Sequence, residues 1–204
     1  MVHAGGVQDA WPEISAVVAA APYRVEVLPV DPERAERCRT ALGMTTRSWL
    51  GALVTHTGGL LVDQGWLRVL GGGHGGLPGA AEVADPAAQL LPVAYDVLGG
   101  QFAWTQARPD APPTVHYFGP DVLAWKDLNQ GYADWLYAML AGSLTEFYAS
   151  LRWPGWAEEV AALSPGEGLH TYPPPSTVEG ADLSRVSRRP VPLTGLVAHH
   201  GGLG

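Results

Sequence analysis

Hydrophobic and polar positions divide the chain into three blocks, with helical spacing at both ends and strand-like spacing in the middle. Near the N-terminus, the apolar stripe predicts a helix over residues 9–20, and strict alternation over residues 23–30 predicts a half-buried strand. Asp31 is a suitable N-cap, and Gly43 a suitable C-terminal residue, for a second helix that reaches Leu42. The first block is therefore helix, strand, helix.

The middle block, from Leu50 to Trp125, contains short apolar runs that glycines separate from one another. The runs lie at residues 52–55, 60–62, 66–70, 91–97, 101–105, 115–118 and 122–125. Gly99 and Gly100 are typical of a tight hairpin turn. This pattern predicts a meander of about six short antiparallel strands.

The C-terminal block returns to helical spacing. We expect a helix over residues 132–140, then a helix that begins with a capping box from Ser143 to Glu146. A short third helix follows Pro154. Beyond Ser164 the chain is rich in proline, glycine and serine, which is typical of a tail without regular structure.

Together the blocks predict one α+β domain over residues 1–204, with an antiparallel sheet flanked by N-terminal and C-terminal helices. Long loops are expected at residues 71–89 and 164–190. Frayed ends are expected at residues 1–8 and at residues 193–204.

Composition narrows the classes of function. The formal net charge is −8, and only Arg185, Arg188 and Arg189 approach a basic cluster, so nucleic acid is a poor candidate partner. No apolar run approaches the roughly 18 residues needed to span a bilayer, and the N-terminus lacks the pattern of a secretory signal. The single cysteine, Cys38, excludes an internal disulfide. We expect a cytoplasmic protein without a cofactor or metal and without membrane binding.

Gly71, Gly73 and Gly76 have the spacing of a dinucleotide-binding motif, directly after an expected strand. That motif needs a helix whose N-terminus meets the pyrophosphate. Pro78 and Pro86 interrupt the sequence where such a helix would begin, so the glycines predict a surface loop.

Histidines supply the strongest catalytic alternative. An expected hairpin would bring His56, Asp63 and His74 near one another, which favours a small hydrolase as one hypothesis. His116 and His170 are isolated in the sequence, and no pair of histidines has the spacing of metal ligands on one helix face.

The eight tryptophans have two interpretations. Trp104, Trp125 and Trp135 lie on periodic faces and are expected in the core. Trp49 and Trp66 are candidate interface anchors, because tryptophan is enriched in binding hot spots. The candidate interface also includes two residues of the glycine-rich segment, Gly73 and His74.

Several long motifs resemble an uncharacterised bacterial family, domain of unknown function twenty-six twenty-five. They are WLGALVTHTGGLLVDQGWLRVLGGGH, VAYDVLGGQFAW, VHYFGPDVLAWKDLNQGYADWL, FYASLRWPGWAEEV and SRRPVP. The resemblance covers most of the chain, from Trp11 to Pro192. It implies no particular activity.

Shorter cues resemble the SUKH superfamily. They are the early Gly-Gly turn, the strand that ends at Asp96 before Gly99-Gly100, the VHYF strand followed by LAWKDL, and the helix with Trp135-Leu136. This resemblance implies an α+β fold and a non-enzymatic immunity protein that neutralises a bacterial toxin. The leading hypothesis is therefore a protein-binding domain. The alternatives are the hydrolase and a structural or oligomerisation module, such as a homodimer.

Overall fold

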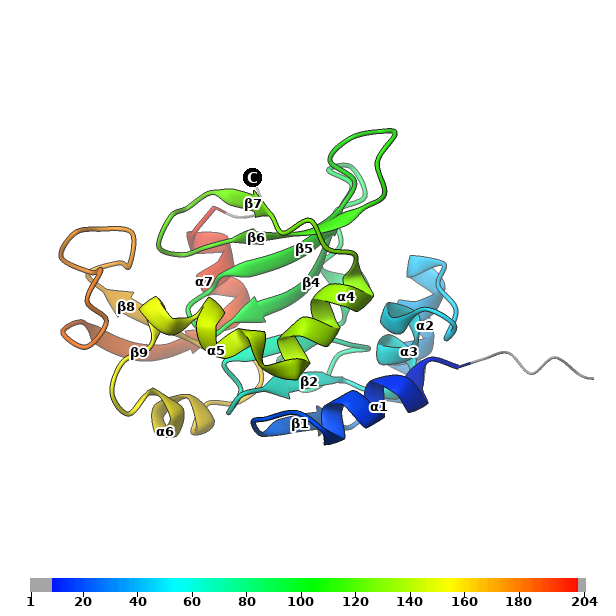
Figure 1. Cartoon of the computed structure of the whole chain (residues 1–204), viewed down its shortest axis with the longest axis horizontal. Coiled ribbons are helices and arrows are strands. Elements are labelled where there is room, and N and C mark those ends of the chain that lie inside the picture. Colours follow the sequence, from blue (N-terminus) through cyan, green and yellow to red (C-terminus); the bar gives the residue numbers. More distant parts are fainter. Residues whose placement is uncertain (1–8, 202–204) are drawn as a thin grey trace, which may run out of the picture.

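The computed structural model describes residues 9–201, and its centre is a seven-stranded antiparallel sheet with the strand order β1-β2-β3-β4-β5-β6-β7. Every strand pairs with its neighbour in the sequence, so β1 and β7 are the two edges. Strands β8 and β9 form a second sheet at one end of the molecule (Figure 1). The expected α+β class is confirmed.

The large sheet consists of β1 (Val25–Leu28), β2 (Gly59–Val62), β3 (Leu67–Leu70), β4 (Leu90–Asp96), β5 (Gln101–Thr105), β6 (Thr114–Phe118) and β7 (Trp125–Asp127). The small sheet consists of β8 (Glu167–Tyr172) and β9 (Ser187–Pro192). The α-helices are α1 (Trp11–Ala19), α2 (Pro32–Leu42), α3 (Trp49–His56), α4 (Tyr132–Ala138), α5 (Leu144–Phe147), α6 (Trp156–Ala161) and α7 (Leu193–His199).

The first two helices form as the sequence predicts. The Asp31 side chain accepts hydrogen bonds from the backbone amides of Glu33 and Arg34, and it thereby caps α2. Gly43 ends the helix in a left-handed conformation with φ of 62°. Helices α1, α2 and α3 pack together beside the sheet, while α4 and α5 cross one of its faces (Figure 1).

The predicted strand at residues 52–55 is wrong, because these residues belong to α3. Ser48 caps this helix by accepting from the amide of Gly51. Leu50, Leu53 and Val54 are all buried, so the helix is apolar around most of its circumference. A buried helix of this kind has the same apolar run as a buried strand, and periodicity alone does not separate them.

The glycine-rich segment at residues 71–89 is held more firmly than a surface loop. Arg34 of α2 forms a two-point ion pair with Glu82, with both nitrogen–oxygen distances 2.6 Å. Glu82 belongs to η1 (Ala80–Glu82), a single helical turn within the segment. Cys38 is buried beside it and accepts from the amide of Ala81. The ion pair and the short helix fix the segment against α2.

The capping box expected at Ser143 is absent, since this side chain caps no helix. Instead, α4 continues through η2 (Met139–Ser143), a wider turn, into α5. Gly142 has φ of 124° and bends the chain there. The bend lets Trp135 of α4 and Tyr148 beyond α5 enter the same buried core.

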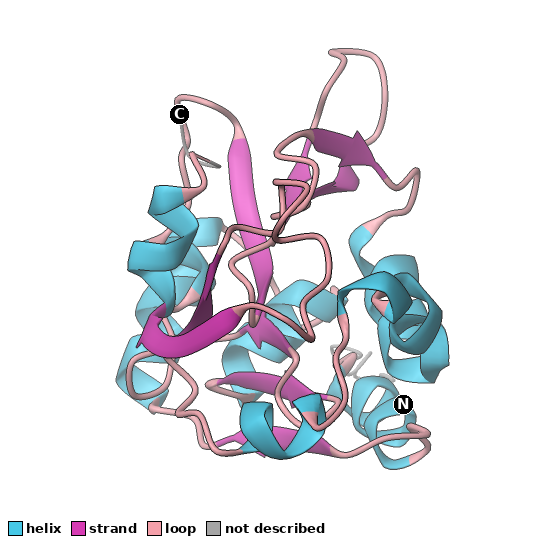
Figure 2. Ribbon diagram, turned by 90° about the vertical axis from the view of Figure 1, so that its left-hand side faces the viewer, coloured by secondary structure: helices cyan, strands magenta, loops and turns pink. Residues whose placement is uncertain are grey.

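The predicted loop at residues 164–190 is wrong at both ends, which form β8 and the start of β9. Residues 193–199, expected to be frayed, form α7, whose Leu193, Leu196 and Val197 are buried. Figure 2 looks onto this end of the molecule and shows the small sheet and its loops in front of the large sheet. Prolines in the sequence obscured the strand pattern. The predictions for residues 1–8 and 202–204 lie outside the described residues.

Candidate functional site

The structure places His56, Asp63 and His74 in three separate hydrogen bonds. His56 pairs with Asp9 at 2.8 Å and stacks on Trp11. Asp63 pairs with Arg152 at 2.5 Å, and it is almost fully buried. The Nδ1 atom of His74 bonds the carbonyl oxygen of Pro29 at 3.0 Å. Each side chain holds a different pair of segments together, and the three are not arranged around a shared contact.

The Gly71-x-Gly73-x-x-Gly76 motif is a packing device. The amides of Gly72 and Gly73 donate to the carbonyls of Thr57 and Gly58, so they are already used by backbone oxygens. A Cβ atom on Gly72 would lie 2.9 Å from the Cα atom of Ala35, which shows how closely α2 approaches. Glycine is therefore needed here, because only a residue without a Cβ atom lets α2 pack this closely on the buried backbone.

Two tryptophan assignments are wrong. Trp66, expected as an exposed anchor, is fully buried, and Gly73 of the same candidate interface is buried too. Trp125, expected in the core, is 37% exposed on edge strand β7. Trp49 is partly exposed and donates from its indole nitrogen to Glu13 at 3.1 Å. Trp135 is buried as expected.

Trp66 lies at the centre of an aromatic and arginine cluster. Its ring contacts the rings of Trp153 and Trp156, with centroid distances of 5.7 and 5.2 Å. The Arg152 guanidinium lies 4.1 Å from the Trp156 ring centroid and also pairs with Asp63. This cluster fixes the β2–β3 turn against the segment that carries α6.

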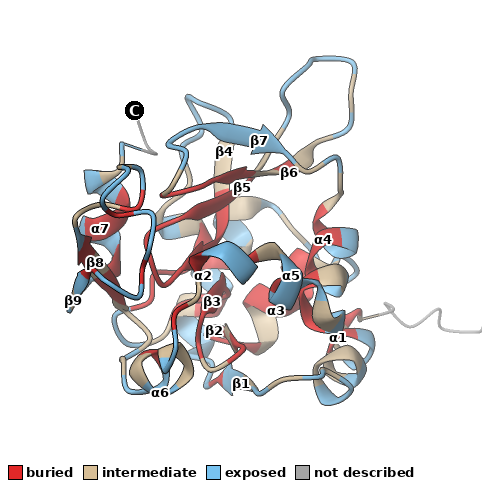
Figure 3. Ribbon diagram, turned by 60° about the vertical axis from the view of Figure 1, so that its left-hand side comes forward, coloured by how far each residue is buried: buried red, intermediate tan, exposed pale blue. Residues whose placement is uncertain are grey.

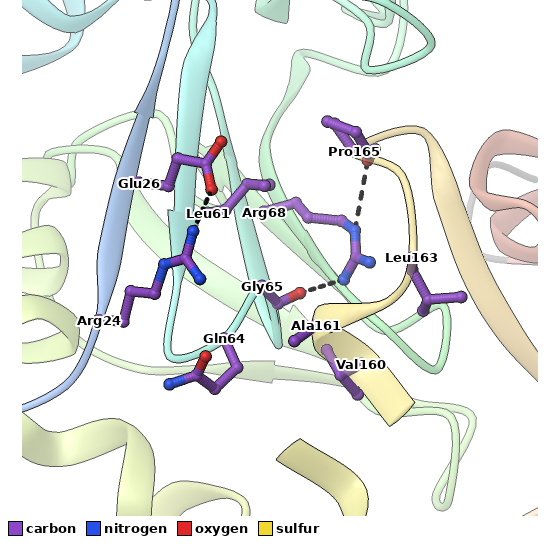
Figure 4. A pocket seen from close by; sticks show the side chains of 10 residues that line it. All are labelled: Arg24, Glu26, Leu61, Gln64, Gly65, Arg68, Val160, Ala161, Leu163 and Pro165. Carbon is purple, nitrogen blue, oxygen red and sulfur yellow. Dashed lines mark hydrogen bonds and ion pairs between the residues drawn. The ribbon is translucent and has the colours of Figure 1, made fainter. Parts of the chain in front are cut away.

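That fixed arrangement encloses a cavity of about 130 Å³, shown in Figure 4. Its walls come from β1 and the residue before it, β2, the β2–β3 turn, β3, α6 and the segment that follows α6. The lining residues are Arg24, Glu26, Leu61, Gln64, Gly65, Arg68, Val160, Ala161, Leu163 and Pro165. Both polar and aliphatic side chains line it. We call it the Arg68 cavity.

Arg68 is the buried charge of this cavity, and only 1% of it is exposed. Its guanidinium donates to the carbonyl oxygens of Gly65 and Pro165, the latter from Nε at 3.3 Å. Among residues 9–201, no carboxylate lies within ion-pair distance of it. Burial lowers the pKa of Arg68 to about 10, while more distant Asp96 and Glu167 oppose that change. Arg68 therefore remains charged at neutral pH.

Asp96, at the end of β4, is a buried charge with a complete set of partners. It accepts from the amides of Leu98 and Gly100 at 2.9 and 2.8 Å. It also accepts from the hydroxyls of Tyr117 and Tyr148 at 2.8 and 3.1 Å. Burial raises the pKa of Asp96, and these hydrogen bonds oppose the shift. All four partners are donors, so they match an ionised carboxylate.

A different part of the molecule exposes large apolar side chains. Val122, Leu123 and Trp125 are 65%, 45% and 37% exposed, and they lie in and just before edge strand β7. We call these three residues the β7 surface. In Figure 3, β7 is exposed, whereas the neighbouring strands of the sheet are mostly buried. The strand expected at residues 122–125 is displaced, since only Trp125 of that range pairs with β6.

A second cavity, of about 200 Å³, adjoins the β7 surface at Leu123. His170 of β8, His199 of α7 and His200 line it together. The His200 ring nitrogen Nε2 donates to the carbonyl of Leu98 at 3.0 Å. Burial lowers the pKa values of His170 and His200, so both favour the neutral form. These histidines meet only because β8 and α7 are ordered.

Similarity to known proteins identifies the family of this chain. The model for "Protein of unknown function DUF2625" matches residues 6–196. This chain belongs to the DUF2625 family. It is 39% identical over 176 residues to YbfG of Escherichia coli strain K12, covering 81% of this chain and 79% of that protein. It is 32% identical over 177 residues to a Haemophilus influenzae protein, covering 81% and 77%. Both relatives are described as uncharacterized. No solved structure matches the chain.

Two further findings describe this DUF2625 member. Within residues 9–201, no group of three or more His, Cys, Asp and Glu side chains is arranged to hold a metal ion. None of the helices in the described range is long and apolar enough to cross a membrane.

The sequence offered one unused signal for the Arg68 cavity. Arg68 is the only charged residue in the apolar run at residues 66–70, and a charge in a buried strand requires a specific partner or a ligand. The apolar run that contains Val122, Leu123 and Trp125 resembled an ordinary core strand, so the sequence contained no comparable indication that the β7 surface is exposed.

Proposed function

We propose that this chain is a non-enzymatic protein-binding domain whose partner docks on the β7 surface. The observation that carries this proposal is the exposure of Val122, Leu123 and Trp125 together at an open sheet edge. An edge strand has unpaired backbone groups that can accept another strand, and adjacent apolar side chains add specificity. The occupant that fits is an extended apolar segment of another protein.

The edge also contains a feature that limits indiscriminate pairing. Strand β7 is only three residues long, and Lys126, the only lysine of the chain, is its middle residue. Short edge strands and lysines oppose unspecific strand addition. The β7 surface therefore suits a partner that contributes side-chain contacts to Leu123 and Trp125 as well as backbone pairing.

The finer part of the proposal is that the partner is a bacterial toxin and that the complex forms in the cytoplasm. The resemblance to the SUKH superfamily supports this role, because its members often neutralise toxins. The net charge of −8 adds support, since an acidic domain suits a basic partner such as a nuclease.

The test is co-expression with a toxin domain encoded beside the gene. We expect the native chain to restore growth and to form a complex in native mass spectrometry. The Leu123→Asp variant should lose both, because a charge would enter an apolar contact. Val30→Asp is the matched control, since Val30 is 38% exposed and follows β1 at the opposite edge.

Failure of the native chain to protect cells or bind the toxin would contradict the immunity role. Equal protection by the native chain and Leu123→Asp would place binding elsewhere. A second copy of the chain is the competing occupant. Light scattering that shows a dimer in the native chain and a monomer in Leu123→Asp would replace the toxin proposal with self-association.

A further inference from the structure

Arg68 differs from the other arginines that are packed inside the protein. Arg152 has Asp63 as its carboxylate partner, and Arg188 has Glu159 at 3.0 Å. Arg68 is more deeply buried than either, yet it donates only to two backbone carbonyls. A buried charge is normally compensated by an opposite charge in contact with it. Among the described residues, no anionic group contacts the Arg68 guanidinium.

The guanidinium has hydrogen-bonding capacity left for an anionic ligand. Nε donates to Pro165 and Nη1 donates to Gly65, while Nη2 has no hydrogen-bond partner within residues 9–201. Figure 4 shows Arg68 reaching between Gly65 and Pro165 at the wall of the cavity. Arginine favours carboxylates and phosphates, because its planar set of donors matches their oxygens.

The other walls indicate what kind of anion fits. Val160, Ala161 and Leu163 contribute aliphatic groups to the cavity. The Arg68 side chain reaches toward this side of the cavity from β3 (Figure 4). Arg24 and Glu26, at the rim, pair with one another at 3.1 Å and so add little net charge. Arg68 has no carboxylate within ion-pair distance among residues 9–201. One such positive charge beside aliphatic groups matches a single negative charge on a short hydrocarbon chain.

We propose that the Arg68 cavity binds a small aliphatic carboxylate, with its carboxylate group on Arg68 and its hydrocarbon part against Val160, Ala161 and Leu163. A dianion such as phosphate fits less well, because Arg68 supplies one positive charge and the Arg24–Glu26 pair adds little more. The cavity of about 130 Å³ accommodates a ligand of only a few carbon atoms.

The cavity is formed before any ligand binds. Asp63 and Gln64 in the β2–β3 turn have left-handed φ angles of 53° and 59°, which such residues rarely adopt. The Asp63–Arg152 pair holds this turn against the segment before α6. Preorganised walls reduce the ordering that a ligand must impose, which favours measurable affinity for a small molecule. The site is independent of the β7 surface, which lies at the opposite edge of the sheet.

The experiment is a titration of the full chain with sodium propionate, followed by backbone amide chemical shifts. Sodium phosphate and sodium chloride at matched ionic strength are the comparison salts. We expect saturable shifts at Gly65, Ala161 and Leu163 with propionate, and no saturation with the other salts. Phosphate that binds as well as propionate would overturn the carboxylate assignment, and no saturation with any salt would overturn the site.

Variants connect the binding to the cavity. Arg68→Met should weaken propionate binding by about tenfold or more, because it removes the charged partner. Arg37→Met is the matched control, since Arg37 is exposed on α2 and does not line the cavity. Ala161→Leu fills the cavity from an exposed helix position and should abolish binding without unfolding the protein. Unchanged propionate affinity in Ala161→Leu would refute the proposal even if Arg68→Met fails to fold.

Discussion

Asp96 and Arg68 are buried charges on neighbouring strands, β4 and β3, but their surroundings differ. Each carboxylate oxygen of Asp96 accepts two hydrogen bonds: Oδ1 from two backbone amides, and Oδ2 from two tyrosine hydroxyls. Arg68 donates to two carbonyls and lines a cavity. Burial alone therefore does not distinguish a structural charge from a binding charge. The distinguishing property is whether the fold itself completes the set of partners.

The largest expected effect on stability comes from Asp96, whose hydrogen-bond partners are all supplied by the fold. Asp96→Asn keeps the shape but places an NH₂ group against donors, which leaves buried polar groups without acceptors. We expect a loss of about 3–5 kcal/mol in the free energy of unfolding, measured by urea denaturation. Asp110→Asn, at an exposed loop position, is the control and should change stability by less than about 0.5 kcal/mol. A similarly small loss in Asp96→Asn would show that the network is not structural.

The paired arginine should have the next largest effect. Arg152→Met leaves Asp63 buried without its partner and removes the cation–π contact with Trp156. We expect a loss of about 2–4 kcal/mol in urea denaturation. Arg37→Met, which breaks only an exposed pair with Glu33, should lose less than about 0.5 kcal/mol. Equal losses in the two variants would contradict a structural role for the Asp63–Arg152 pair.

Arg68→Met should cost less than either, because it removes a buried charge that has no contacting carboxylate within residues 9–201. We expect the free energy of unfolding to change by less than about 1 kcal/mol, since lost hydrogen bonds are offset by the relief of charge burial. The same denaturation experiment decides the point. A loss as large as that of Asp96→Asn would make Arg68 a structural residue and would remove the contrast between the two charges.

The smallest effect concerns His200, which borders the second cavity. Burial lowers its pKa below the ordinary value of 6.5. The hydrogen bond to Leu98 and the charge of Asp96 oppose that shift, while His199 and His170 add to it. The unfolded state then binds protons first as pH falls, so the contribution of His200 to stability is present above pH 6.5 and is lost as pH falls through the lowered pKa.

His200→Asn should therefore flatten the pH dependence of stability. Between about pH 7.5 and about pH 5, we expect the native chain to lose up to about 1 kcal/mol more than the variant in thermal denaturation. An unchanged pH profile would show that protonation of His200 is not linked to folding.

Much of the fold followed from local patterns in the sequence. Asp31 and Gly43 bounded α2 correctly, and Gly99-Gly100 marked the β4–β5 turn. The residues of α3 were misassigned because an apolar run of this length suits a buried helix as well as a buried strand. Strand β9 contains two prolines, and β8 is short and lies between Pro165 and Pro173. Both strands were missed, because their order also depends on distant contacts such as that of Leu169 with Val97.

The candidate site was less predictable, since contacts between distant segments create it. Arg68 meets Pro165, and Asp63 meets Arg152, across long stretches of sequence. The spacing of residues within a short stretch of sequence does not predict contacts of this kind. The glycine motif was a local pattern, and its amides proved to be used by Thr57 and Gly58. Motif spacing identified the glycines, but only the packing of α2 explains them.

One measurement observes both charges in a single sample. Propionate is titrated into the protein while the side-chain Nε–Hε signal of Arg68 and the carboxyl carbon of Asp96 are followed by NMR. We expect a saturable shift at Arg68 and a constant signal at Asp96. An unmoved Arg68 signal, or equal and unsaturated drift at both groups, would contradict the claim that the fold completes one charge and leaves the other for a ligand.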